Sequence, residues 1–242
     1  MSELNRAIII EDNEDVIEAV SLALQIRWPR ADIVYTESGE KGIEMVEKKK
    51  PDVVILDLGL PDVSGFDVLK SIRNFSIVPI VILTVRGEEV DIIKGLELGA
   101  DEYIVKPFRQ LELTSRINAI IRRQCSTEFK TEVISGPLCL YPQERFVRYK
   151  EREINLTCSE NIILQQLMEN EGFVLSPAKL AQELWGDSYP EAISGIKVYI
   201  RRLRQKIERT PDHPKLILTK RGLGYLLPKF DEQSNKPDHS ST

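Results

Sequence analysis

The first half of the chain alternates short, wholly apolar runs with longer amphipathic stretches. Runs such as Ala7–Ile10 and Val53–Leu56 are typical of strands that are buried on both faces. The stretches between them repeat apolar residues at helical spacing, and Pro or Gly residues separate the two kinds of segment. We expect strands near 7–12, 32–37, 53–58, 79–85 and 102–106, and helices near 14–26, 39–49, 65–73, 88–98 and 109–123. This alternation predicts an α/β domain over residues 1–123, a doubly wound (βα)5 unit with a five-stranded parallel sheet.

The pattern changes after residue 123. Residues 124–135 have no sustained periodicity, and we interpret them as a linker. Beyond it, the pattern predicts short strands at 138–141, 146–149 and 154–156, helices near 157–170, 176–185 and 191–209, and a closing hairpin with strands at 216–219 and 225–227. We therefore expect a second, α+β domain over residues 136–228, followed by a polar tail, 229–242, that is disordered.

Chemically active side chains end four of the apolar runs in the first domain. Glu11 and Asp12 follow the first run, Asp57 the third, Thr84 the fourth and Lys106 the fifth. Because the carboxyl ends of parallel strands meet at one edge of a sheet, we expect these side chains to converge. Carboxylates beside a hydroxyl and an ammonium group suit a phosphoryl-acceptor site, with Mg²⁺ balancing the negative charge.

The helix expected near 191–209 has a narrow apolar stripe between two cationic flanks. Ile196, Ile200, Leu203 and Ile207 share one side of a helical wheel. Five cations lie on its flanks: Lys197, Arg201, Arg202, Arg204 and Lys206. This arrangement fits a helix that is docked on its own domain and faces phosphates, although an ordinary solvated amphipathic helix would give a similar pattern.

Composition narrows the possible functions. The net charge of −5 combines an acidic first half with a mildly basic second half. The net charge alone therefore does not indicate nucleic-acid binding. The cysteines, Cys125, Cys139 and Cys158, lack metal-ligand spacing, and the two histidines are isolated, which argues against zinc or histidine-based catalysis. No signal segment and no apolar run of membrane-spanning length is present, so we expect a cytoplasmic protein without a membrane partner.

The motifs IIIEDNED, VVILDLGLPDVSGFDVL, PIVILTVRGEE and GLELGADEYIVKPF make residues 5–123 similar to the receiver domain of bacterial response regulators. The resemblance implies that Asp57 accepts a phosphoryl group from the histidine of a sensor kinase. It also implies that Glu11, Asp12, Asp57 and the Gly59 carbonyl bind Mg²⁺, and that Thr84, Lys106 and Tyr103 act as phosphate-binding and switch residues. Glu11 departs from the more usual Asp, and Val85 stands where a smaller residue is commoner.

The second domain resembles the winged-helix effector of the OmpR/PhoB class through AKLAQELWG, GIKVYIRRLRQKI and LTKRGLGYLL. The class implies a third helix that enters the major groove and a wing that reaches the minor groove. The DNA-binding residues that we expect are Lys197, Arg201, Arg202, Arg204, Lys206, Thr219, Lys220 and Arg221. Among them, Arg202 and Arg204 are the expected readers of bases or backbone, and Arg201 and Lys206 the expected phosphate contacts. Gly195 weakens this helix, and Ser194 and Lys197 differ from the class.

Members of this class pair their active receivers through the fourth helix, fifth strand and fifth helix. The residues expected in such a homodimer are Glu97, Asp101, Glu102, Glu112, Arg116 and Arg123, whereas Ile92 and Asn118 interrupt the usual charge pattern. The leading hypothesis is a phosphorylation-controlled, non-enzymatic transcription regulator that binds tandem half-sites on promoter DNA, with RNA polymerase as a further partner. The alternatives are a degenerate receiver that binds DNA without phosphorylation, and a receiver that drives an enzymatic output.

Overall fold

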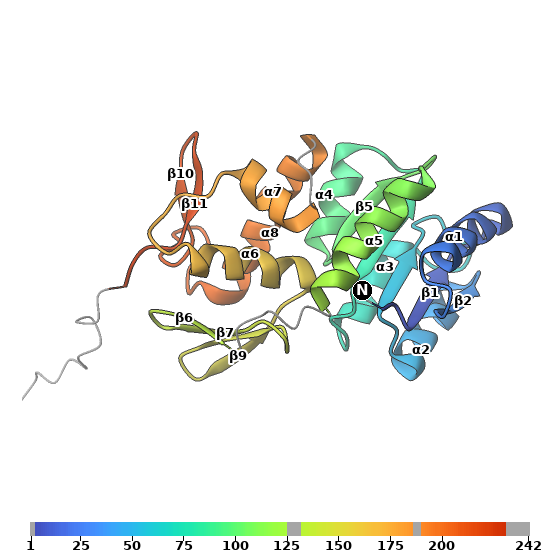
Figure 1. Cartoon of the computed structure of the whole chain (residues 1–242), viewed down its shortest axis with the longest axis horizontal. Coiled ribbons are helices and arrows are strands. Elements are labelled where there is room, and N and C mark those ends of the chain that lie inside the picture. The colour runs from blue at the N-terminus through green and yellow to red at the C-terminus, as the bar shows by residue number, and fades with distance from the viewer. Residues whose placement is uncertain (1–2, 125–131, 186–189, 231–242) are drawn as a thin grey trace, which may run out of the picture.

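The computed structural model describes residues 3–124, 132–185 and 190–230, with the side chains of residues 123, 124 and 190–192 left out. Two domains lie side by side (Figure 1). The elements of the first are β1 (Arg6–Ile10), α1 (Glu14–Arg27), β2 (Asp32–Thr36), α2 (Gly39–Lys49), β3 (Val53–Leu56), α3 (Gly65–Arg73), β4 (Ile80–Thr84), α4 (Glu89–Glu97), β5 (Glu102–Val105) and α5 (Gln110–Gln124). The predicted alternation of strands and helices is therefore confirmed.

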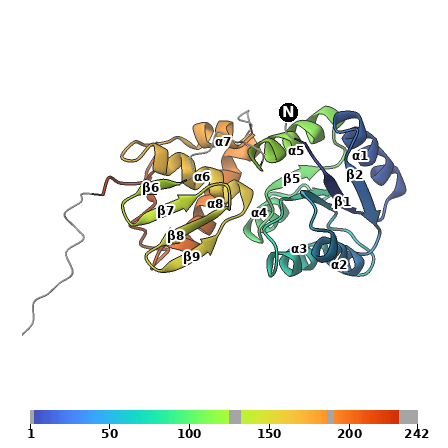
Figure 2. The same ribbon diagram turned by 60° about the horizontal axis from the view of Figure 1, so that its bottom comes forward.

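The five strands form one parallel sheet in the order β2-β1-β3-β4-β5. Helices α1 and α5 cover one face, and α2 and α3 cover the other (Figure 2). Every residue of β3 and β4 is buried, as the continuous Val/Ile runs require for strands covered on both faces. The order reverses between β1 and β3, so their carboxyl ends flank the crevice where sheets of this type place their sites.

The second domain begins with an antiparallel sheet, which is followed by a helical layer and a hairpin. Its elements are β6 (Val133–Ser135), β7 (Leu138–Tyr141), β8 (Phe146–Tyr149), β9 (Arg152–Asn155), α6 (Cys158–Glu169), α7 (Pro177–Trp185), α8 (Pro190–Ile207), β10 (Leu218–Lys220) and β11 (Gly224–Leu226). Strands β6 to β9 pair in sequence order, and β10 pairs with β11. This is the predicted α+β winged-helix architecture, in which β10 and β11 form the wing.

Strand β6 is the one described element that the sequence pattern did not predict. It lies inside the segment 124–135 that we interpreted as a linker, and its three residues pair with β7. A run of three residues is too short to show a period, so its pairing with β7 defines it. Residues 125–131, in the rest of that segment, and residues 231–242, in the expected tail, lie outside the described residues.

The two domains meet where α8 contacts α4, and both ribbon views show these helices side by side (Figures 1 and 2). Helix α6 also contacts the first domain, through α5. Among the described residues, no helix is long and apolar enough to cross a membrane.

Candidate functional site

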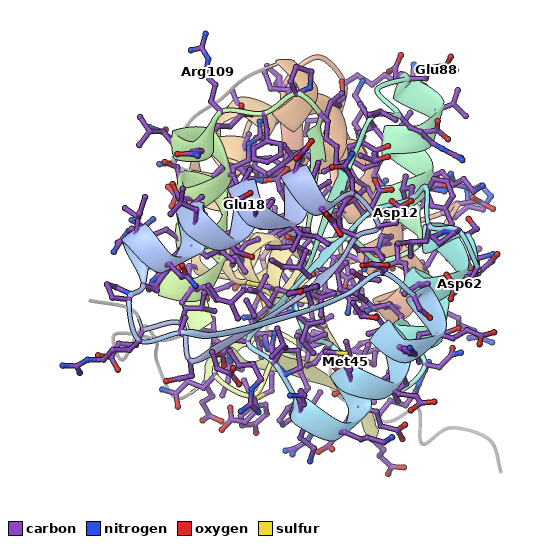
Figure 3. All side chains as sticks on the ribbon, turned by 90° about the vertical axis from the view of Figure 1, so that its right-hand side faces the viewer. Asp12, Glu18, Met45, Asp62, Glu88 and Arg109 are labelled. Carbon is purple, nitrogen blue, oxygen red and sulfur yellow. The ribbon has the colours of Figure 1, made fainter. Side chains whose placement is uncertain are left out.

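Three carboxylates converge at the carboxyl ends of β1 and β3. Oxygens of Glu11, Asp12 and Asp57 all lie within 4.8 Å of one another. Glu11 and Asp57 are buried, whereas Asp12 is exposed. Figure 3 shows Asp12 on the same side of the domain as Asp62 and Glu88, which belong to the loops after β3 and β4. The site therefore opens toward solvent through Asp12 and the loops around it.

Lys106, which follows β5, forms ion pairs with two of these carboxylates. Its Nζ lies 2.5 Å from Glu11 Oε2 and 3.3 Å from Asp57 Oδ1. Burial raises the pKa of the Glu11 carboxyl, and the hydrogen bond from Lys106 works in the opposite direction. Glu11 thus takes the nearer contact with the ammonium group.

The loop after β3 fixes the Asp57 carboxylate. The Gly59 N–H donates to Asp57 Oδ2 at 2.6 Å, which leaves Oδ1 toward Lys106. Gly65 begins α3 against the same backbone: a Cβ at this position would lie 2.2 Å from the Asp57 carbonyl oxygen. A side chain at residue 65 is therefore incompatible with the observed position of Asp57.

Asp62 connects this loop to the start of α2. Its carboxylate accepts hydrogen bonds from the Gly39 N–H at 3.0 Å and the Ser38 hydroxyl at 2.8 Å. These bonds hold the pKa of Asp62 well below its usual range, with the Gly39 N–H as the largest cause. A carboxylate at a helix N-terminus also interacts favourably with the helix dipole. Asp62 was not among the predicted site residues, because the Pro-Asp dipeptide in which it lies resembles an ordinary turn.

Thr84 and Tyr103 approach the site through the loop after β4. Thr84 is buried at the end of its strand, and its carbonyl accepts the Lys106 N–H at 2.7 Å. The Tyr103 hydroxyl donates to the Arg86 carbonyl at 2.6 Å, and the Arg86 N–H approaches Thr84 Oγ1 at 3.4 Å. The two predicted switch residues are therefore linked to each other by one residue of this loop.

The carboxylate cluster has the chemistry that a hard divalent cation requires. Mg²⁺ takes oxygen ligands, usually one or two carboxylates with waters or phosphate oxygens completing the shell. Glu11, Asp12 and Asp57 offer oxygens on one side, and the exposure of Asp12 leaves the approach open to water. The residues present fit a magnesium ion.

The predicted DNA-binding residues of the second domain fall into two groups. Lys197, Arg201, Thr219, Lys220 and Arg221 are exposed on α8 and the wing. The other three predicted cations are bound within their own domain. Arg202 is buried against Glu160 at 2.8 Å, Lys206 contacts the same carboxylate at 2.6 Å, and Arg204 donates to the Ile217 carbonyl at 2.7 Å.

Glu160 is fully buried, and these two cations keep its carboxylate ionised. Burial acts to raise its pKa, yet Arg202 and Lys206 together hold that pKa below the ordinary value. The carboxylate also accepts the Thr157 N–H at 2.8 Å, which completes the predicted capping of α6. In this conformation, two of the predicted DNA contacts therefore stabilise the fold of the domain.

The predicted dimer residues lie on α4, just before β5, on β5 and on α5, but two of them face the second domain. Glu102 is buried and pairs with Arg116 at 3.0 Å, and Arg116 also pairs with Glu112 at 2.6 Å. Glu97 pairs with Arg201 of α8 at 2.5 Å. Asp101 is fully buried and accepts the Ser159 N–H of α6 at 3.1 Å. The side chain of the remaining residue, Arg123, lies outside the described part of the chain.

Comparison with known proteins places both domains. Residues 7–118 match the family model described as "Response regulator receiver domain", and residues 151–227 match "Transcriptional regulatory protein, C terminal". The structure is similar to that of a RitR mutant in which aspartate replaces a cysteine, with a TM-score of 0.74 at 25% identity over 93% of this chain and 100% of that chain. It is also similar to DrrB of Thermotoga maritima, described as an OmpR/PhoB homolog, with a TM-score of 0.50 at 28% identity over 93% of this chain and 99% of that one.

Proposed function

We infer the function of this chain from its family, since it belongs to the two-component response regulators of the OmpR/PhoB, winged-helix class. It is a response-regulator transcription factor. We propose that Asp57 accepts a phosphoryl group from a sensor histidine kinase in a Mg²⁺-dependent reaction. Phosphorylation then promotes pairing of receivers (residues 1–123) and binding of the winged-helix domains (residues 136–228) to tandem half-sites on promoter DNA.

One observation carries this proposal: the convergence of Glu11, Asp12, Asp57 and Lys106 at the carboxyl edge of the sheet. A receiver that had lost phosphorylation would not need to keep an ammonium group beside three carboxylates. The intact set favours a phosphorylated regulator over the alternative of a degenerate receiver. The match of the second domain to a transcriptional regulatory family favours DNA over an enzymatic output.

The chemistry proposed for Asp57 is attack of a carboxylate oxygen on phosphorus. The new O–P bond forms as the P–N bond of the kinase phosphohistidine breaks, and the imidazole nitrogen keeps the electron pair. Asp57 Oδ2 is held by the Gly59 N–H, so Oδ1 is the oxygen free to attack once Lys106 turns toward the phosphate. Glu11, Asp12, Asp57 and the Gly59 carbonyl would hold Mg²⁺, which would balance the charge of the phosphate.

The switch would follow from the new phosphate beside Thr84 and Lys106. Thr84 offers a hydroxyl and Lys106 a cation, and both groups lie at strand ends next to Asp57. A shift of Thr84 would be transmitted to Arg86 and Tyr103 through the contacts in the loop after β4. A local change in charge at Asp57 would thus shift the loop after β4 between two arrangements.

For DNA binding, α8 would enter the major groove and the wing would reach the minor groove. The exposed Lys197, Arg201, Lys220 and Arg221 are the cations ready to contact phosphates or bases. RNA polymerase is a further partner suggested by the class. A promoter as target supports a cytoplasmic location for the protein.

The test is phosphorylation by acetyl phosphate with Mg²⁺, followed by intact mass, beside sedimentation with and without beryllofluoride. Wild type will gain one phosphoryl mass and, with beryllofluoride, will sediment as a dimer. Asp57→Asn will do neither. Asp67→Asn, which changes an exposed aspartate on α3, is the matched control and will behave as wild type. Equal phosphorylation of Asp57→Asn and wild type would eliminate Asp57 as the acceptor.

A further inference from the structure

Asp62, in the loop after β3, is bonded to the start of α2 by three donors. Its Oδ1 accepts the Gly39 N–H at 3.0 Å, and its Oδ2 accepts the Ser38 hydroxyl at 2.8 Å and the Glu40 N–H at 3.2 Å. An amide in this place would turn its own N–H groups toward the N–H of either Gly39 or Glu40. The surroundings of this exposed side chain therefore select a carboxylate.

The loop and the helix are also packed tightly against each other. Gly39 is the first residue of α2, and a Cβ added to it would lie 2.5 Å from Val63 and 3.1 Å from Leu60. A side chain at residue 39 would therefore push the loop away from the helix. Asp62 lies between Leu60 and Val63 in the chain, so its hydrogen bonds form where the two segments are in close contact.

Ser38, the N-cap of α2, connects Asp62 to the ends of two strands. Its N–H donates to Thr36 Oγ1 at 3.2 Å, at the end of β2. The Thr36 carbonyl in turn accepts the Glu11 N–H at 3.1 Å, just after β1. A chain of hydrogen bonds therefore runs from Glu11 to the loop after β3. We refer to its three intermediate residues, Thr36, Ser38 and Asp62, as the clamp.

The two ends of this chain carry the two halves of the proposed magnesium site. Glu11 and Asp12 follow β1, whereas the Gly59 carbonyl belongs to the loop that also carries Asp62. Gly59 is exposed, so burial does not fix its position. Because Mg²⁺ requires nearly ideal octahedral geometry, its affinity depends on how well the two halves are held relative to each other.

We propose that Asp62 is a positioning residue of the metal site. Through the clamp, it fixes the Gly59 carbonyl relative to Glu11 and Asp12, which raises the affinity of the site for a divalent cation. Asp62 acts through the backbone of its own loop, without contacting the ion. The proposal rests on the proposed function and deepens it, because it adds to the ligands a group that holds them in place.

A purely electrostatic role for Asp62 is the rival explanation, since a carboxylate near the site attracts cations without holding the loop. Two variants separate these roles. Asp62→Asn removes both the charge and an acceptor, whereas Ser38→Ala removes only the hydroxyl and leaves every charge in place. Ser38→Thr keeps the hydroxyl, and Asp67→Asn removes an exposed carboxylate of α3 that pairs with Lys70. The last two variants are the matched controls.

Binding of Mg²⁺ to the full-length protein is measured from the stability that it adds against urea at constant ionic strength, since an ion that binds only the folded state stabilises it according to its affinity. Wild type and the two controls will share one dissociation constant. Asp62→Asn and Ser38→Ala will each bind about tenfold more weakly, as is usual when a group that orients a metal ligand is lost. Their double variant will be no weaker than Asp62→Asn, because both changes break the same bond. Stability without Mg²⁺ is recorded in the same series, which separates a general loss of stability from a loss of metal affinity.

Phosphorylation by acetyl phosphate will show a matching split. In both clamp variants the Mg²⁺ concentration for half-maximal rate will rise about tenfold, and the rate at saturating Mg²⁺ will stay within about twofold of wild type.

Unchanged Mg²⁺ affinity in Ser38→Ala would overturn the proposal, whatever Asp62→Asn does, because the charge alone would then explain any effect. A wild type whose stability does not respond to Mg²⁺ would overturn it as well. If wild type binds Mg²⁺ but is not phosphorylated, the proposed function fails, and the Mg²⁺ titrations still decide the role of Asp62.

Discussion

Arg73, at the end of α3, is the residue whose substitution we expect to destabilise the receiver most. It is mostly buried, and it donates to the carbonyls of Gly99 and Val78 besides pairing with Asp101. Burial lowers the pKa of the guanidinium to about 10, so it remains charged at neutral pH. One side chain therefore joins α3 to the loop before β4 and the loop before β5.

Arg73→Met removes the partner of a carboxylate that is 0% exposed. Breaking a buried ion pair from one side typically costs about 3–5 kcal/mol, because the remaining charge stays buried without compensation. Lys70→Met is the control on the same helix: Lys70 and Asp67 are both more than half exposed, and such pairs contribute about 0–1 kcal/mol. We expect at least about 2 kcal/mol between the two variants.

Urea unfolding followed by Trp28 fluorescence, in a Trp185→Phe background, reports on the receiver, since Trp28 is buried at the end of α1. With a slope of about 1–3 kcal/mol per molar urea, the expected difference moves the midpoint by about 1–2 M. Adding Asp101→Asn to Arg73→Met removes the orphaned charge and will recover part of the loss. The reasoning is refuted if Arg73→Met unfolds within about 0.3 M of Lys70→Met.

Three further outcomes follow from the site and its surroundings. Burial raises the pKa of Glu102 above 4.5, and Arg116 offsets only part of that rise. The contribution of this carboxyl group to stability is therefore complete below pH 4.5 and is lost as pH rises. Urea unfolding will show the free energy of unfolding of Glu102→Gln increasing relative to that of wild type toward pH 8. Gly65→Ala will cost at least about 1–3 kcal/mol, measured by the same unfolding, because its Cβ would meet backbone. Val85, beside Thr84, will slow hydrolysis of the phosphoryl group, so Val85→Ala will lose phosphate faster; slower loss in Val85→Ala would contradict this.

The fold was predictable because the receiver strands are covered on both faces. Continuous Val/Ile runs such as Val53–Leu56 require that environment, and the polar residues after them then fall at one edge of the sheet. The grouping of Glu11, Asp12, Asp57 and Lys106 follows from strand order alone. Asp62 could not be found this way, because its bonds to Ser38 and Gly39 depend on how two loops approach each other.

The contact between the domains was beyond sequence reasoning for a different reason. Ser159 and Tyr199 lie in ordinary helical patterns. Arg202 is a cation on a basic helix, as a DNA contact would be, whether or not a receiver covers it. Their partners lie on α4 and just before β5, 58 to 106 residues away, and belong to a separate domain. A local pattern identifies a cationic helix, but only the placement of the domains identifies what that helix touches.

The internal partners of Arg202, Arg204 and Lys206 have a consequence for how DNA affinity responds to salt. Each phosphate neutralised by a protein cation releases condensed counterions, which gives a slope of about −0.9 per contact in log K against log salt. Cations held by Glu160 or by the Ile217 carbonyl contribute little to that release. If only Lys197, Arg201, Lys220 and Arg221 meet phosphates, as we propose, the expected slope is about −4 per domain, against about −6 if all the cations of α8 and the wing met phosphates. We therefore expect DNA binding by this regulator to be less sensitive to ionic strength than its basic helix suggests.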